Sequence, residues 1–246
     1  MHRRPGRGRS RDRRRGAVIL CALLLLAGCG SGTSPRETSP RSPAAEAEWA
    51  WLQRTEGELA RRRAQAAGRP ADPGLARQTQ ALADELNRRL VEFLNADPPV
   101  QGEPLTSRQK AALRMKSDED IHLAHAFIEQ GGDYQRALDL YQQALAVDPG
   151  NPRLQEELAR ARARRYMARG TFAQVQKGMD QDEVRRLLGQ PNLNNVRAYP
   201  DHGGIAGWFY PKDATGAAAA VWFHKENGRF TVYLADFDAV RPPASA

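Results

Sequence analysis

The sequence predicts an α+β fold, in which antiparallel helices come first and a small antiparallel sheet follows. Two observations carry this prediction. Between residues 44 and 169, apolar side chains recur every three or four positions, which is the spacing of one face of an α-helix. After Gly170 the apolar stretches become short, and Asn227-Gly228 between two of them is typical of a β-hairpin turn.

A basic segment with eight arginines precedes an apolar run of eleven residues, Ala17 to Ala27. That length suits the hydrophobic core of a signal peptide and is too short to span a bilayer as a helix. The run ends in Leu26-Ala27-Gly28-Cys29, which resembles the lipobox of bacterial lipoproteins. The resemblance implies that residues 1–28 are removed and that Cys29 is acylated, so that the acyl chains hold the protein on a membrane. A plain signal peptide or a buried helix is the alternative.

The formal net charge of +8 belongs to this signal. Residues 1–28 contain eight arginines and one acidic residue, which leaves a net charge of about +1 on the remainder. We therefore expect no nucleic-acid partner. Of the two cysteines, Cys21 leaves with the signal and Cys29 is acylated, so neither a disulfide nor a thiolate metal site is expected.

Residues 29–43 are rich in Ser, Pro, Gly and Thr, and this composition predicts a flexible tether. A helical pattern follows from Ala44 to Ala67. A second helix is predicted after Asp72, a good N-cap, with Pro73 at the first helical position. Two such helices indicate an antiparallel hairpin. Its apolar stripe packs inside the protein or, alternatively, docks a partner.

A third helix is predicted after Thr106, which forms a capping-box signature with Gln109. Whether the polar run from Lys116 to Asp120 interrupts this helix is left open by the sequence. Beyond this run, two apolar faces flank the turn Gly131-Gly132-Asp133-Tyr134 and resemble a tetratricopeptide repeat. The residues that carry the resemblance are Leu123, Ala124, Phe127, Gly132, Asp133, Tyr134, Ala137, Tyr141, Ala144 and Pro149.

The repeat has one extra glycine in its turn, and an ordinary helical hairpin is the alternative interpretation. The resemblance implies a protein-binding role, with His125 and Glu129 on the concave groove. We expect the helical region to cover residues 44–169, with the helix after Asn151 as its cap.

The segment after Gly170 predicts a short helix that Asp180 and Glu183 cap and that Gly189 ends. We expect Leu188 of this helix to be among the most buried side chains. Three strands are predicted, at residues 207–210, 218–224 and 229–237.

A set of residues in this region carries a family resemblance: Phe172, Val175, Gly178, Met179, Glu183, Val184, Leu188, Gly189, Pro191, Trp208, Tyr210 and Phe223. With these residues the region resembles the SmpA/OmlA (BamE-like) family. The resemblance implies two short helices on a three-stranded antiparallel sheet over residues 170–240, followed by a tail at 241–246. It also implies an envelope lipoprotein that works with the β-barrel assembly machinery.

The sequence contains no nucleophile–base pair, phosphate loop or zinc spacing, so we expect no catalytic residues, no cofactor and no small-molecule substrate. Glu119 and His122 have the spacing of one arm of a di-iron site, but there is no second pair, and we expect no metal. Trp208, Tyr210 and Trp222 are candidates for partner contact, although at least one of them is expected in the core.

Together these features predict an outer-membrane lipoprotein that faces the periplasm and acts as a protein–protein adaptor in outer-membrane assembly or envelope integrity. Gly30 favours the outer membrane, since Asp at that position is the familiar inner-membrane retention signal. Two alternatives are an accessory lipoprotein for a pilus or secretion channel and a periplasmic inhibitor or regulator of an enzyme.

The first testable prediction concerns Cys29. Each buried methylene of an acyl chain contributes about 0.8 kcal/mol to membrane binding, and stable anchoring requires two or more chains. Replacing Cys29 by Ser should therefore release the protein from membranes or leave an uncleaved precursor. Fractionation and mass spectrometry measure both results, and a mature mass without any acyl addition would contradict the prediction.

Overall fold

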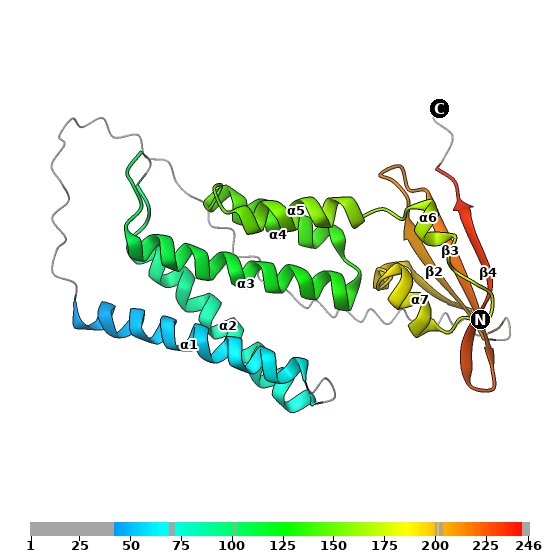
Figure 1. The fold of residues 1–246 in the computed structure, drawn as a ribbon, viewed down its shortest axis with the longest axis horizontal. Coiled ribbons are helices and arrows are strands. Elements are labelled where there is room, and N and C mark those ends of the chain that lie inside the picture. The colour runs from blue at the N-terminus through cyan, green and yellow to red at the C-terminus, as the bar shows by residue number, and fades with distance from the viewer. Residues whose placement is uncertain (1–41, 69–71, 101, 200, 202–203, 243–246) are drawn as a thin grey trace, which may run out of the picture. The chain divides into compact units, whose positions relative to one another are not determined.

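The computed structural model describes residues 42–68, 72–100, 102–199, 201 and 204–242, which all belong to the unit Ser42–Ala246. Long helices come first and a four-stranded antiparallel sheet follows (Figure 1). This arrangement confirms the predicted α+β class. The signal, Cys29 and almost all of the predicted tether lie outside the described residues.

The long helices begin where the sequence places their caps. The Asp72 side chain accepts hydrogen bonds from the backbone N–H groups of Gly74 and Leu75, both at 2.9 Å. Thr106 and Gln109 form the predicted capping box. The helices are α1 (Pro43–Ala67), α2 (Pro73–Ala96), α3 (Ser107–Gly131), α4 (Tyr134–Val147) and α5 (Pro152–Arg164).

Helix α3 runs without interruption through its polar residues. Lys116 and Asp120 pair with each other, and the Ser117 hydroxyl donates a hydrogen bond to Asp148. Asp118 and Glu119 pair with arginines on neighbouring helices. Because every residue of this run has a partner on α3, on an adjacent helix or, for Ser117, at the C-cap of α4, the polar sequence is compatible with a continuous helix.

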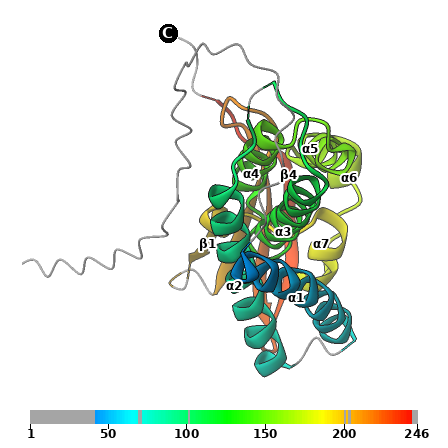
Figure 2. The same ribbon diagram turned by 90° about the vertical axis from the view of Figure 1, so that its left-hand side faces the viewer.

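The helices form two layers. In the end-on view of Figure 2, α1, α3 and α5 form one layer, and α2 and α4 form the other. Each helix packs against the next in the chain. Two apolar cores result. One lies between α1, α2 and α3 around Leu52, Leu86 and Leu90, and the other lies between α3, α4 and α5 around Tyr141.

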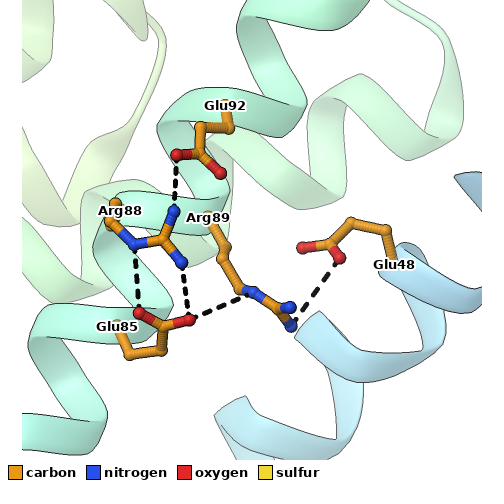
Figure 3. Close-up of polar contacts among 5 residues, drawn as sticks. All are labelled: Glu48, Glu85, Arg88, Arg89 and Glu92. Carbon is orange, nitrogen blue, oxygen red and sulfur yellow. Dashed lines mark hydrogen bonds and ion pairs between the residues drawn. The ribbon is translucent and has the colours of Figure 1, made fainter.

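Charged residues also link α1 to α2. The guanidinium of Arg89 lies 4.0 Å from the centroid of the Trp51 ring, and its Nη1 lies 3.6 Å from Oε2 of Glu48 (Figure 3). Such exposed pairs are typically worth less than about 1 kcal/mol, so the hairpin is held mainly by its apolar stripe. That stripe packs inside the protein. The other members of the charged group in Figure 3 are Glu85, Arg88 and Glu92.

The sheet has the strand order β1-β2-β3-β4, with every neighbouring pair antiparallel. Its strands are β1 (Val196–Tyr199), β2 (Ile205–Pro211), β3 (Ala218–Glu226) and β4 (Arg229–Val240). The predicted turn joins β3 to β4, and Asn227 and Gly228 both have positive φ, 50° and 82°. The prediction of three strands missed β1, because this strand is short and three of its residues are exposed, so it lacks an apolar alternation.

Helices α6 (Arg169–Phe172) and α7 (Gln181–Leu188) pack against one face of the sheet (Figure 1). Asp180 and Glu183 form the predicted capping box of α7. The expectation for Leu188 was wrong: Leu188 is only partly buried, whereas Val184 is fully buried. The reason is position, since Val184 lies in the middle of the helix and Leu188 lies at its end.

The two faces of the sheet carry different residues. Trp208, Tyr210, Val221, Phe223 and Val232 form a core with α6 and α7. The strand alternation and register place another set on the opposite face, which we call the open face. The residues of the open face include Arg197, Tyr199, Ile205, Gly207, Phe209, Pro211, Ala218, Ala220, Trp222 and Leu234.

Gly132, in the turn of the predicted repeat, has a structural role. Gly132 ends α3 with φ 60° and ψ 21°, a left-handed conformation that favours glycine. A Cβ atom on Gly132 would lie 2.4 Å from the carbonyl oxygen of Gln190 and 2.5 Å from the backbone nitrogen of Asn192. The turn therefore packs directly against this backbone.

None of the described helices has the length and apolarity needed to cross a bilayer.

The second prediction tests this contact. Gly132→Ala and Gly102→Ala both place a side chain at positive φ, a conformation that costs about 1–3 kcal/mol. Only at Gly132 must backbone also move, which typically costs a further 1–3 kcal/mol, because a Cβ at Gly102 meets no described atom within 4 Å. Urea unfolding should therefore show the larger loss for Gly132→Ala, and equal losses would contradict the packing.

Candidate functional site

Charged side chains join α1 to α3. The guanidinium of Arg63 donates two hydrogen bonds to the carboxylate of Glu119, at 2.8 and 2.7 Å. Arg108 of α3 makes a similar bidentate pair with Glu46 of α1, at 3.1 and 2.9 Å. A bidentate pair fixes orientation as well as distance. These pairs therefore set how α1 lies beside α3.

A second set of charged contacts joins α3 to α5. Nε2 of His125 lies 3.0 Å from Oε2 of Glu157, and Arg153 pairs with Asp118. The other carboxylate oxygen of Glu157 accepts a hydrogen bond from Arg160 at 2.7 Å. We call the charged side chains on this layer of three helices the charged face. Its members are Glu56, Arg63, Asp118, Glu119, His122, His125, Glu129, Arg153 and Glu157.

Several titratable groups of α1 and α3 are shifted in the direction that disfavours their charged form. Burial, and then the negative charges of Asp118 and Glu119, raise the pKa of Glu56. Burial raises the pKa of Asp120 despite the opposing ion pair with Lys116. Partial burial and the neighbouring guanidinium of Arg63 lower the pKa of His122. Keeping Glu56 and Asp120 ionised at neutral pH therefore reduces the stability of the fold.

Groups held at a cost to stability are a feature of functional sites, where selection acts on binding or chemistry rather than on folding alone. Structural ion-pair networks also shift pKa values. On this layer, however, one of the shifted groups, His122, itself reaches solvent. The arrangement can present both signs of charge to a partner.

The structure places both residues predicted on the repeat groove on α3. The side chain of His125 is 38% exposed, and that of its partner Glu157 is 16% exposed. Glu129 is exposed and lies one helical turn beyond His125, on the same side of α3. The two residues therefore lie together on the charged face.

The three aromatic residues that were predicted to contact a partner lie on different faces of the sheet. Trp208 and Tyr210 are only 3% and 5% exposed and belong to the core beneath α7, so the expectation that they meet a partner was wrong. Their alternation along β2 turns both toward the helices. Burial also raises the pKa of Tyr210. Trp222 lies on the open face and is partly exposed, with its ring centroid 6.0 Å from that of Phe209.

The described residues contain no group of three or more His, Cys, Asp or Glu side chains that could hold a metal ion. Glu119 and His122 thus have no further ligands within the described part of the chain. Glu119 instead pairs with Arg63.

Sequence reasoning missed Arg63 and Glu157 as members of the charged face. Their partners lie 56 and 32 residues away along the chain, so no local spacing connects them. One signal was present: Glu119 and Asp120 occupy buried positions of α3, where an apolar residue is usual. A buried carboxylate requires a partner, and that partner could have been sought among the arginines of α1.

Comparison with known families agrees with the repeat. The Tetratricopeptide repeat family model matches residues 127–177, which cover the end of α3 together with α4, α5 and α6. The match confirms a TPR-like helical region and indicates a role in protein–protein interaction. No curated protein and no solved structure matches the chain significantly.

The third prediction follows from the raised pKa of Glu56. Glu56→Gln should raise stability at pH 7, because it removes a carboxylate that is destabilised by burial and by acidic neighbours. The gain should shrink as the pH falls from 7 toward the unfolded-state pKa of about 4.3, because the wild-type carboxyl is then increasingly protonated in both states. Urea midpoints between pH 4 and pH 7 measure this difference.

A matched control lies on the same helix. The carboxylate of Glu58 pairs with Arg62 at 2.6 Å, so Glu58→Gln should give no gain at pH 7. Equal effects of the two substitutions at every pH would show that neither burial nor the acidic neighbours destabilise the carboxylate of Glu56.

Proposed function

We propose that this chain is an envelope lipoprotein, anchored in the outer membrane through acyl chains on Cys29, that acts as a protein–protein adaptor in outer-membrane protein assembly or envelope integrity. The lipobox supports the anchor. The Tetratricopeptide repeat match supports the adaptor role. The resemblance of residues 170–240 to the SmpA/OmlA family supports the link to the β-barrel assembly machinery.

The observation that carries the adaptor role is the charged face. Its ion pairs Arg63–Glu119 and Arg153–Asp118 use up part of the charge in holding α1, α3 and α5 side by side. His122 and Glu129 remain exposed on α3. A partner with complementary charges can therefore bind a surface whose backbone positions are already set, so little ordering accompanies binding.

We assign a different role to each successive part of the chain. The acyl chains hold the protein at the membrane, the tether lets the folded part reach its partner, and the charged face selects that partner. A flexible chain of the tether's length has an r.m.s. reach of roughly 20 Å. The partner is therefore a protein that exposes its binding site close to the membrane surface.

The fourth prediction reverses one charge on this face. Glu129→Lys should weaken recovery of the partner when the acylated protein is purified from membranes, because a rim charge contributes to complementarity and on-rate. Helix content by circular dichroism should not change, since Glu129 is exposed.

The control is Asp139→Lys, the same charge reversal at an exposed position of α4 in the other helix layer. It should leave recovery unchanged. Recovery that survives Glu129→Lys, or that falls equally in both variants, would remove the charged face from the proposal.

A further inference from the structure

The sheet region has a hollow that is separate from the charged face. Its volume is about 400 Å³, and it lies where β2 and β4 end and β3 begins. The described residues that line it come from β1, the ends of the other strands and the adjoining loops. They are Asn195, Arg197, Tyr199, Phe209, Pro211, Gly216, Ala217, Ala218 and Val240.

The hollow exists because β1 is short and because the residues at the start of β3 have small side chains. The pairing of β1 with β2 starts at Val196, opposite Trp208, whereas β2 continues to Pro211. The open face beyond Trp208 is therefore flanked by the 3₁₀ turn Leu193–Asn195 rather than by a strand. On the β3 side, the hollow is lined by Ala218, whose methyl group is too small to fill it.

The lining is apolar with one positive charge. Tyr199 and Phe209 provide aromatic walls, and Val240 and the alanines provide aliphatic surface. Arg197 is the single cation among the nine described lining residues, which include no acid. Its Nη1 donates to the backbone oxygen of Asn194 at 2.6 Å, and this contact holds the guanidinium beside the start of β1.

A ligand that matches this lining has an apolar group next to a carboxylate. Within an extended polypeptide, an acidic side chain and its immediate neighbour point to opposite sides, and the next side chain on the same side lies about 7 Å further along the chain. The C-terminal residue carries its side chain and its carboxylate on one Cα atom. Arginine binds carboxylates through two parallel hydrogen bonds, and an apolar side chain gains from burial against aromatic walls.

We propose that this hollow binds the C-terminal residue of a partner polypeptide, with the free carboxylate on Arg197 and an apolar side chain between Tyr199 and Phe209. The position of β1 at the sheet edge suits this ligand, because a chain end can approach along the edge strand. This site is independent of the charged face and shares no residue with it.

The test uses the full-length protein and three short peptides. The probes are acetyl-Gly-Gly-Leu with a free carboxylate, the same peptide with a C-terminal amide, and acetyl-Gly-Gly-Ser with a free carboxylate. Titrations followed by heteronuclear NMR measure the dissociation constants, with the methyl signals of Ala217 and Ala218 as reporters. The free leucine peptide should bind about tenfold more tightly than either of the others, since each of these lacks one of the two interactions.

Two variants locate the interaction. Arg197→Gln should make the acid and the amide bind equally, which a merely structural role of Arg197 would not do. Ala218→Leu should fill the hollow and abolish binding of all three peptides. The control Arg162→Gln removes an exposed arginine of α5 and should change nothing.

The unaltered protein alone can overturn the proposal, so the test does not depend on the folding of any variant. Absence of saturable binding, equal binding of the acid and the amide, or shifts confined to signals outside the hollow would each do so.

Discussion

The packing of α3 against helices on more than one side is the constraint on which the helical half depends. This helix contributes to both apolar cores, with Ala112 and Met115 on one side and Ile121 and Ala124 on the other. Both cores therefore require α3 to be continuous and correctly rotated. Because the helix has neighbours on several sides, its polar residues must find partners within the protein, and this requirement produces the ion pairs of the charged face.

Those ion pairs fix the orientation of the helices and contribute little to the free energy of folding. A buried or half-buried pair loses much of its attraction to desolvation, whereas removing one partner leaves an uncompensated charge. Arg63 and Glu119 thus specify how α1 lies on α3 without adding much to the free energy of folding. The same physics explains why Glu56 and Asp120 remain destabilising. An apolar interface would be more stable, but it would present no charge to a partner.

In the sheet region, glycine and alanine residues determine which surface stays exposed. A Cβ atom on Gly207 would lie 3.2 Å from Cε2 of Phe209 and 3.3 Å from the Trp222 ring. The absence of a side chain there lets both aromatic rings lie close to the open face. Small residues at the start of β3 leave the adjoining hollow. One face of the sheet is thus filled by helices, while the other keeps aromatic surface exposed to solvent.

The sequence by itself determined the elements whose signals are local. The caps at Asp72, Thr106 and Asp180 and the turn at Asn227-Gly228 appear where predicted, because hydrogen bonds between near neighbours decide them. The repeat was also recognisable, since its apolar spacing lies within one pair of helices.

Only the tertiary structure decided which residues share a surface. The partners of Glu119 and His125 lie on other helices, so sequence spacing cannot pair them. Trp208 and Trp222 look equivalent as sequence, yet one lies in the core and the other on the open face. Strand β1 was missed because its residues are mostly exposed, and its place is set by pairing with β2 rather than by its own pattern. Burial and pairing between distant segments depend on how the elements pack, and no local pattern contains that information.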